Sequence, residues 1–254
     1  MEFDYANTLL VFLRVTPFLL VLPFFSAVNF PPTMRIAIGA LMGVLLAPLL
    51  PAYHLEKLQL FPLLGVMIQE ISIGLLLGFV ARMIFYAVDL AGNIVASEMG
   101  LNMAAMFNPL TNQSEQAPGL ILFFLATIVM LTLDLHHWVL MGFARTYMVL
   151  PIGQAHINGA LFEALVKHTG TIFVVALQIS APVIAVSFVI TLVFAVMSRA
   201  VPQMNVFAES LGFRVAGGLV VFGFTMQLTA QHVSNYLNRL PDDLLRIAQL
   251  MGGS

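Results

Sequence analysis

Asp134, His136 and His137 form the densest group of possible metal ligands in this sequence, and Trp138 follows them directly. Two imidazoles and a carboxylate so close together could hold a divalent metal or relay a proton. The spacing does not match an HExxH helix, and no remote carboxylate completes a site. His and Trp at the end of an apolar run are typical of the membrane–water interface. We therefore interpret the group as interfacial, with no metal site, and keep metal or proton-relay chemistry as the alternative.

Single charges also stand inside other apolar runs of the chain. They are Arg14, Glu70, Arg82, Asp89, Glu98 and Arg199. An intramembrane charge costs about 2.5 kcal/mol or more unless it is paired, and it is functional by default. Arg82 and Asp89 are seven residues apart, so they lie on roughly one helical face. The alternative is that some of these charges flank a hairpin tip in the headgroup region, and both interpretations stay open.

Composition sets the class of protein. The chain has 254 residues, of which 60% are hydrophobic and 9% charged. Because a soluble domain carries about 25% charged residues, this chain is expected to be an all-α integral membrane protein or a subunit buried in a membrane complex. Its net charge of −2 gives no attraction for nucleic acid. Without cysteine or a recognisable nucleophile, the chain is predicted not to be an enzyme, and no cofactor is expected.

Of the first two apolar runs, residues 9–28 and 36–50, the first is expected to be covered by other helices. The first contains Arg14 together with Pro17 and Pro23, which each remove a backbone donor. In the second, Gly39 and Gly43 have the spacing that lets another helix approach closely.

Residues 60–96 repeat that small-residue spacing at Gly74 and Gly78. Their charge-free runs are too short to span a bilayer, so we expect one or two hairpins that do not cross lipid in the ordinary way. Residues 116–133 are a charge-free span that ends at Asp134. A further run, Val139 to Leu150, ends at Pro151-Ile152-Gly153.

The longest charge-free stretch is residues 168–197, interrupted in its middle by Gln178, Ser180 and Pro182. A broken helix there can mark a transporter site or a kink that lets a neighbour pack. A polar turn, residues 198–207, separates it from the last span, Val215 to Val233. The tail from Asn238 to Ser254 has the pattern of a short amphipathic helix.

The stretch from Gly92 to Pro118 starts as a helix and ends as a polar loop. Met99, Met103 and Met106 are spaced to share one helical face, and Asn108-Pro109 is predicted to end the helix. Because Met repacks easily, such a face could seal and then yield. The alternative is a core helix followed by a solvated loop.

Several stretches resemble the FliR family of flagellar and type III secretion export-gate proteins, the T subunit of injectisomes. The matching stretches are Gln69-Glu70, Ile73-Gly74, Leu77-Gly78-Phe79, Ala91-Gly92-Asn93-Ile94, Met99-Gly100-Leu101, Asn108-Pro109, His137-Trp138, Leu150-Pro151-Ile152-Gly153, Ala181-Pro182 and Arg199 through Phe207. The family usually has Gln where this chain has Glu98, Asp where it has Asn108, and proline where it has Arg214.

The resemblance implies a single export-gate domain over residues 1–254, with a FliP-like part at roughly 1–180 and a FliQ-like part at 181–254. It implies that the chain joins FliP and FliQ at the entrance of the secretion channel, in the inner membrane within the basal body. A FlhB-type switch protein and secreted chains in transit are further implied partners. The loop Met106 to Gln116 resembles the family's plug, which closes the pore at rest.

Our main hypothesis is therefore a non-enzymatic channel subunit. The residues expected in the pore seal and plug are Met99, Met103, Met106, Phe107, Asn108, Pro109, Leu110, Asn112 and Gln113. Those expected to hold helices and subunits are Arg14, Glu70, Gly74, Gly78, Arg82, Asp89, Glu98, Arg199, Pro202, Gln203 and Asn205. The alternative is a proton-coupled secondary transporter that uses the break at Gln178 to Pro182 and a relay through Asp134, His136 or Glu98.

Overall fold

Helices account for almost all of the regular structure in a computed structural model that describes residues 5–23, 31–51, 60–102, 117–201, 203 and 205–252. The elements are α1 (Tyr5–Val21), α3 (Pro32–Leu46), the short 3₁₀ helix η1 (Ala47–Leu49), α4 (Leu60–Glu98), α6 (Ala117–Thr132), α7 (Leu135–Val149), α8 (Gly159–Ala200) and α9 (Val206–Gly252). No strand occurs in these ranges, so the prediction of an all-α chain is confirmed.

The chain divides into two compact units. Unit 1 comprises Met1–Met83, Asp134–Thr169 and Asn238–Ser254, and unit 2 comprises Ile84–Leu133 and Gly170–Leu237. Helices α4, α8 and α9 each contribute residues to both units. The predicted FliP-like and FliQ-like parts concern likeness to other proteins, which this division does not test, so they stay a prediction.

Helix α4 is one continuous helix of 39 residues, so the predicted hairpins within residues 60–96 are wrong. No proline follows Pro62 within it, so every later residue can donate its backbone N–H. Glu70 does not interrupt the helix because Arg14 pairs with it inside unit 1.

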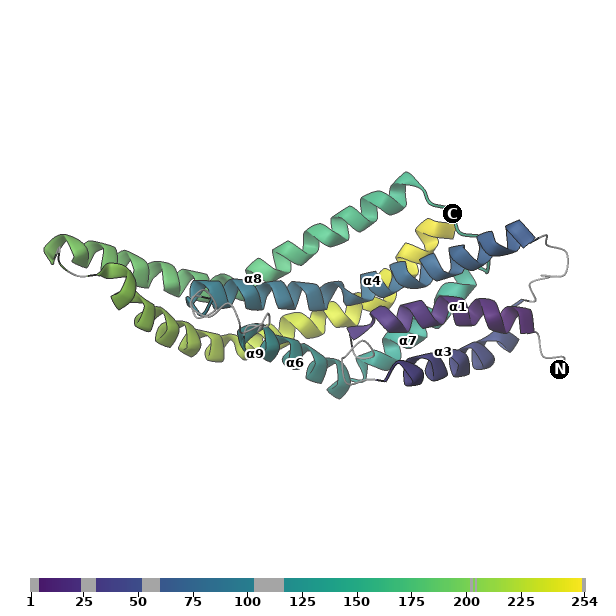
Figure 1. The fold of residues 1–254 in the computed structure, drawn as a ribbon, viewed down its shortest axis with the longest axis horizontal. Helices are drawn as coiled ribbons and strands as arrows, with labels where there is room; N and C mark the ends of the chain where they lie inside the picture. Colours follow the sequence, from purple (N-terminus) through teal and green to yellow (C-terminus); the bar gives the residue numbers. More distant parts are fainter. Residues whose placement is uncertain are drawn as a thin grey trace. The chain divides into compact units, whose positions relative to one another are not determined.

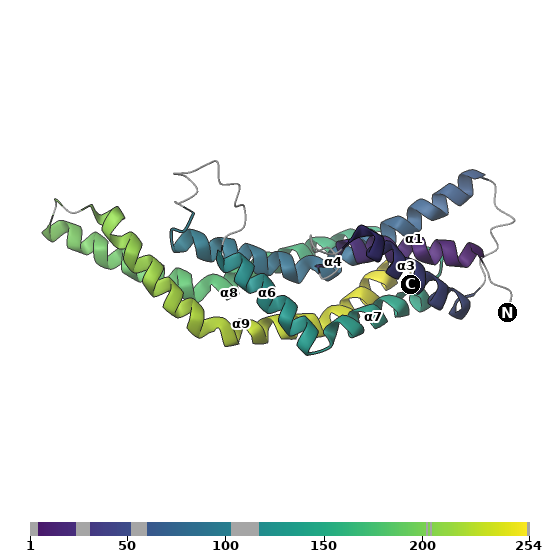
Figure 2. The ribbon, with the colours of Figure 1, turned by 60° about the horizontal axis from the view of Figure 1, so that its bottom comes forward.

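In unit 1, α1 lies between α3 and the first part of α4 (Figure 1). The glycine spacing predicted to allow close approach is confirmed on both neighbours. A Cβ on Gly39 would lie 2.5 Å from Thr16 Oγ1, and one on Gly74 would lie 2.2 Å from the carbonyl oxygen of Arg14. The backbones of these helices can approach this closely only because the contact positions lack side chains. Figure 2 shows α3 beside α1 from a second direction.

Helix α7 and the last turns of α9 complete the core of unit 1. Phe18 of α1 stacks on Phe143 of α7, with the ring centroids 4.2 Å apart. A Cβ on Gly142 would lie 2.9 Å from Cα of Pro241, so α7 and α9 also touch through a glycine. The backbone N–H of His156 donates to the carbonyl of Met251, which fixes the loop after α7 on the end of α9.

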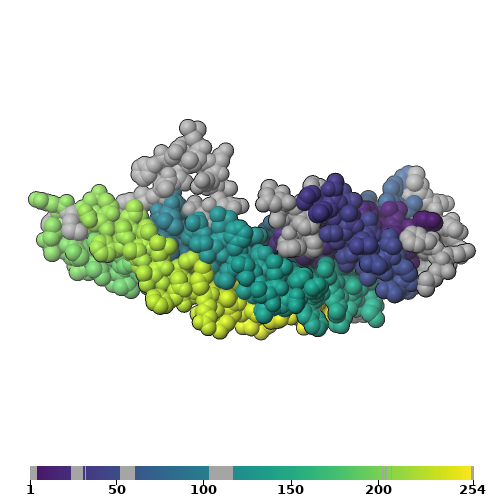
Figure 3. Space-filling view, turned by 90° about the horizontal axis from the view of Figure 1, so that it is seen from below, coloured from purple at the N-terminus to yellow at the C-terminus, as the bar shows by residue number. Residues whose placement is uncertain are grey.

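Unit 2 contains the end of α4, all of α6, α8 from Gly170 to its end, and α9 from its start to Leu237. Phe85 of α4 packs on Phe123 of α6, and Phe194 of α8 packs on Phe213 of α9. Figure 3 shows α6, in teal, beside the yellow-green part of α9 on one surface of this unit.

In the described ranges, three helices are long and apolar enough to cross a membrane, namely α4, α8 and α9, and the α6–α7 pair could add a fourth span. Helix α8 runs through Pro182 without ending, so the predicted break at Gln178 to Pro182 is wrong. Proline removes one hydrogen bond there, and the packed helix tolerates the loss. Ser180 Oγ donates to the carbonyl of Ala176 within the same turns.

Candidate functional site

A buried ion pair joins α1 to α4 in unit 1. Arg14 Nε lies 2.5 Å from Glu70 Oε2, and Arg14 Nη2 donates to Glu70 Oε1 at 3.0 Å. Both side chains are 0% exposed. The expectation that Arg14 is covered and paired is confirmed, and two parallel bonds to one carboxylate give the pair a fixed geometry.

The same pair holds the loop after α7. Arg14 Nη1 donates to the carbonyl of Leu150 at 3.0 Å, and the backbone N–H of Gly153 donates to Glu70 Oε1 at 3.0 Å. Arg14 Cζ also lies 4.2 Å from the centre of the Tyr147 ring. Because a buried charge is tolerated only when its hydrogen-bonding capacity is met, these contacts explain how two ions remain inside an apolar unit.

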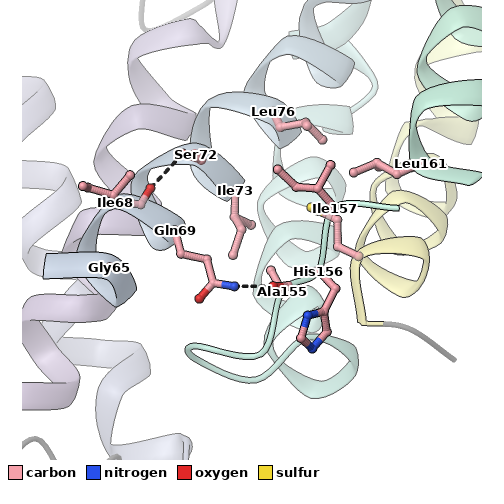
Figure 4. A pocket seen from close by; sticks show the side chains of 11 residues that line it. Gly65, Ile68, Gln69, Ser72, Ile73, Leu76, Ala155, His156, Ile157 and Leu161 are labelled. Atoms are coloured by element: carbon pink, nitrogen blue, oxygen red, sulfur yellow. Dashed lines mark hydrogen bonds between the residues drawn. The ribbon is translucent and has the colours of Figure 1, made fainter. Parts of the chain in front are cut away.

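A pocket of about 280 Å³ lies beside this loop, still within unit 1 (Figure 4). Gln69 points from α4 into it, and its Nε2 donates to the carbonyl of Ala155. Most of the wall is apolar, from residues such as Ile68 and Leu161. Gln69-Glu70, one of the stretches that carried the resemblance, thus attaches α4 to the loop at two neighbouring positions.

In unit 2, α4 ends at Glu98, ten residues before the predicted stop at Asn108-Pro109, so that prediction is wrong. The backbone N–H of Leu101 donates to the carbonyl oxygen of Ala96, and the backbone N–H of Gly100 donates to the carbonyl oxygen of Ser97. Gly100 has φ +76°. These three features form a Schellman motif, which ends a helix at a glycine that adopts a left-handed conformation.

Met99 lies in this turn and is 0% exposed. A Cβ on Gly218 of α9 would lie 2.6 Å from Met99 Cγ, and one on Gly100 would lie 2.3 Å from Leu211 Cδ1. Met99 is therefore packed against α9, and the helix that precedes it does not continue toward Met103 and Met106. The other residues of the predicted seal and plug, Met103 through Gln113, lie outside the described residues.

A second contact fixes the start of α6 against α4. A Cβ on Gly92 would lie 2.2 Å from Cα and 2.6 Å from the backbone nitrogen of Gly119. Gly92 precedes the end of α4 by six residues, and Gly119 follows the start of α6 by two. Both ends of the segment that joins these helices are therefore held in unit 2.

The remaining charged residues on the predicted contact list are not all buried. Arg82 is half-buried and donates from Nη1 to the carbonyl of Val21 at 3.4 Å. Glu98 is half-buried, whereas Asp89 and Arg199 are exposed. Asp89 and Arg199 are exposed on α4 and α8 in this chain, so their expected role in holding helices and subunits stays a prediction.

The polar turn between α8 and α9 starts the second helix. Asn205 Oδ1 accepts from the backbone N–H of Ala208 at 3.3 Å, and the Asn205 carbonyl accepts from Glu209. Asn205 is therefore the N-cap of α9. Gln203 is exposed, and Pro202 lies outside the described residues.

Asp134, His136 and His137 are brought together at the start of α7. Their possible donor atoms all lie within 4.8 Å of one another. His137 Nδ1 is 3.5 Å from Asp134 Oδ1, and both side chains are largely exposed.

Three contributors to these arrangements were not singled out from the sequence. They are the Tyr147 ring, Gly119 and Gly218. The adjacent Gly217-Gly218 inside an apolar span was a usable signal, because glycine in such a helix marks close approach. Tyr147 gave no comparable signal, since its role depends on where α1 places Arg14.

Almost the whole chain is similar to one family of known proteins. Residues 5–240 match the family model described as "Bacterial export proteins, family 1". The chain belongs to this family. The family membership predicted from sequence motifs is thus confirmed. The matched range includes the Arg14–Glu70 pair, the turn at Met99 and the cap at Asn205.

Relatives of this export-family chain cover nearly its full length. It is 29% identical over 252 residues to "Flagellar biosynthetic protein FliR" of Bacillus subtilis (strain 168), covering 97% of this chain and 96% of that protein. A protein of the same name from Pectobacterium carotovorum subsp. carotovorum is 29% identical over 239 residues, with 92% and 90% covered. The one from Escherichia coli (strain K12) is 28% identical over 236 residues, with 92% and 90% covered.

Proposed function

We propose that this chain is a non-enzymatic subunit of the flagellar protein export gate, which forms the entrance of the secretion channel together with FliP and FliQ. The observation that carries the proposal is the family match over residues 5–240. The relatives named flagellar biosynthetic protein FliR, which match over nearly their whole length, favour a flagellar system.

The distribution of apolar surface supports a subunit of a larger complex in the membrane. The most apolar part of α4 is 61% buried by the chain itself, but that of α9 is only 11% buried. Large apolar side chains such as Phe173 and Phe188 of α8 and Phe224 of α9 are exposed. Surfaces of this kind need lipid or partner helices to cover them. In the proposed complex, FliP and FliQ cover part of this surface in the inner membrane, within the basal body.

The anchored segment between α4 and α6 supports a plug. The Met99 and Gly92 contacts hold its two ends, while Met106 to Gln116 would reach across the channel. In this proposal Met103, Met106 and Phe107 seal the pore, because a constriction of adaptable apolar side chains closes by excluding water. Met99, which is buried against α9, serves as the anchor of the plug.

Three exposed polar residues support contacts with neighbouring subunits. Asp89, Arg199 and Gln203 are exposed, and charged groups at a subunit interface fix register and exclude wrong partners. They would face FliP, FliQ or a FlhB-type switch protein, while secreted chains pass through the channel. The likeness of residues 1–180 to FliP and of 181–254 to FliQ belongs to the same proposal.

The plug can be tested by replacing Met103 to Gln116, which includes both the apolar seal and the polar loop, with a Gly-Ser linker of equal length. The complex should still assemble, and the membrane should conduct small ions because nothing closes the pore. A matched control replaces residues 52–59, a second connecting segment, with a linker of equal length and should leave conductance at background. If the plug variant also stays at background while it assembles normally, the plug assignment is wrong.

Purification separates this function from a proton-coupled transporter. An export-gate subunit should be unstable alone and should co-purify with FliP and FliQ, whereas a transporter should form a small self-sufficient particle that binds a solute. The continuous helix through Pro182 removes the structural break on which the transporter alternative depended. A stable solute-binding monomer that leaves FliP and FliQ behind would overturn the gate proposal.

A further inference from the structure

The first turn of α7 carries a group of donors that the export function does not use. Asp134, His136 and His137 each offer one donor atom, and these atoms lie within 4.8 Å of one another. The group follows α6 and precedes Trp138, which is 53% exposed. Asp134 and His137, whose side chains are 74% and 68% exposed, can be reached by an ion from the surroundings.

Two of these side chains lack an ordinary structural role. Asp134 is the N-cap residue of α7, yet its side chain makes no capping hydrogen bond. An N-cap Asp normally accepts from a backbone N–H of the first turn, but here the carboxylate is directed toward His137 Nδ1, 3.5 Å away. His136 Nδ1 is shielded from solvent and has no hydrogen-bond partner among the described residues.

We propose that Asp134, His136 and His137 form a binding site for a divalent transition-metal ion such as Zn²⁺. Two imidazole nitrogens and one carboxylate oxygen are a donor set that such ions prefer. Ligands about 2.0–2.2 Å from a tetrahedral ion lie about 3.3–3.6 Å apart, so donor atoms that now lie within 4.8 Å of one another have to close by up to about 1.5 Å. His137 and Asp134 can make this adjustment because their side chains are 68% and 74% exposed.

The site is open and is independent of the proposed export function. Three protein ligands leave the fourth position of a tetrahedral ion to water. The ion would fix the backbone turn at Asp134, whose φ of 53° is the one positive value at a non-glycine residue in the described ranges.

The test uses the full chain without a polyhistidine tag, purified with the partners that it needs. Zn²⁺ is titrated in competition with a chromophoric chelator, and Cu²⁺ binding is followed by electron paramagnetic resonance. We expect one Zn²⁺ per chain and a Cu²⁺ spectrum with couplings to two nitrogens. His136→Ala combined with His137→Ala should weaken Zn²⁺ binding at least ten-fold, and Asp134→Asn should weaken it less.

His156→Ala is the matched control, because His156 is exposed in the same unit and lies outside the group. It should leave the Zn²⁺ affinity unchanged. Size-exclusion profiles of all variants should match, since the substituted side chains are mainly at the surface. Absence of bound Zn²⁺ overturns the proposal, and so does unchanged affinity in the double variant or an equal loss in His156→Ala.

Discussion

Removing the Glu70 carboxylate should destabilise the protein strongly, because it leaves the Arg14 guanidinium charged and buried. Glu70→Ala removes both bonds to Arg14 and leaves the Gly153 N–H without its acceptor. Breaking one side of a buried pair costs about 3–5 kcal/mol. At about 2–4 °C per kcal/mol for a chain of this size, Tm should fall by at least about 6 °C.

The double variant Arg14→Met/Glu70→Leu separates the loss of the ion pair from the burial of a lone charge. It removes both charges and keeps apolar volume, which is often close to neutral in stability. The Leu150 carbonyl and the Gly153 N–H still lose a partner, at about 1–3 kcal/mol each. We therefore expect the double variant to melt below the wild type but above Glu70→Ala.

Thermal unfolding of the detergent-solubilised complex measures these differences, with Glu163→Ala as the control. Glu163 is exposed on α8 in the same unit, so its replacement makes the same change in net charge without burying an unpaired ion. Its Tm should stay close to that of the wild type. The reasoning is refuted if Glu70→Ala melts within about 2 °C of this control, or if the double variant is the less stable of the two.

Three further substitutions test local packing by the same measurement of Tm. Gly74→Ala should lower the free energy of unfolding by about 1–3 kcal/mol, because its Cβ would lie 2.2 Å from the carbonyl oxygen of Arg14. Gly65→Ala is the control and should be neutral or stabilising, since nothing described lies within 4 Å of its Cβ. Equal effects of the two substitutions would contradict the contact at Gly74. Met99→Ala should lower the free energy of unfolding by about 2–5 kcal/mol because it opens a cavity, and Met99→Leu should retain most of the wild-type stability. A neutral Met99→Ala would show that Met99 is not packed. Asn205→Ala should lower the free energy of unfolding by about 1 kcal/mol, because it removes the N-cap of α9. Asn205→Ser should preserve most of this stability, so equal losses in the two variants would exclude the cap.

The burial of Arg14 could be predicted from sequence, but its partner could not. A charge inside a run with two prolines has to be covered, and the structure confirms this. Glu70 stands 56 residues away, and other carboxylates were available on the same helix. The choice depends on the register of α1 on α4, which the contact between Gly74 and the Arg14 backbone sets. The spacing of small residues predicts which face of α4 contacts a neighbouring helix, but it does not predict which residue of α1 lies opposite each position.

Charges inside residues 60–96 predict hairpins that reach the headgroup region, whereas α4 is one continuous helix. Glu70 needs no headgroup region, since Arg14 and Gly153 satisfy it internally. The end of the helix differs from its prediction for another reason. Gly100 is a residue that can end a helix in a left-handed conformation. The proline at Asn108-Pro109 is the stronger helix-ending signal, so the sequence predicts the end there instead. Helix α4 ends where Gly100 and Leu101 donate to the carbonyls of its last turn.

Two glycines in α9 lie on an exposed face of unit 2. Gly212 and Gly223 are exposed, and no described atom lies within 4 Å of a Cβ built on either. They are eleven residues apart, so they lie on nearly the same helical face. Lipid accepts any apolar side chain there, and glycine instead of alanine costs the helix about 1 kcal/mol. A partner helix that approaches closely makes glycine useful at both positions. Under the proposed export-gate function, a partner helix rather than lipid would cover this face of α9.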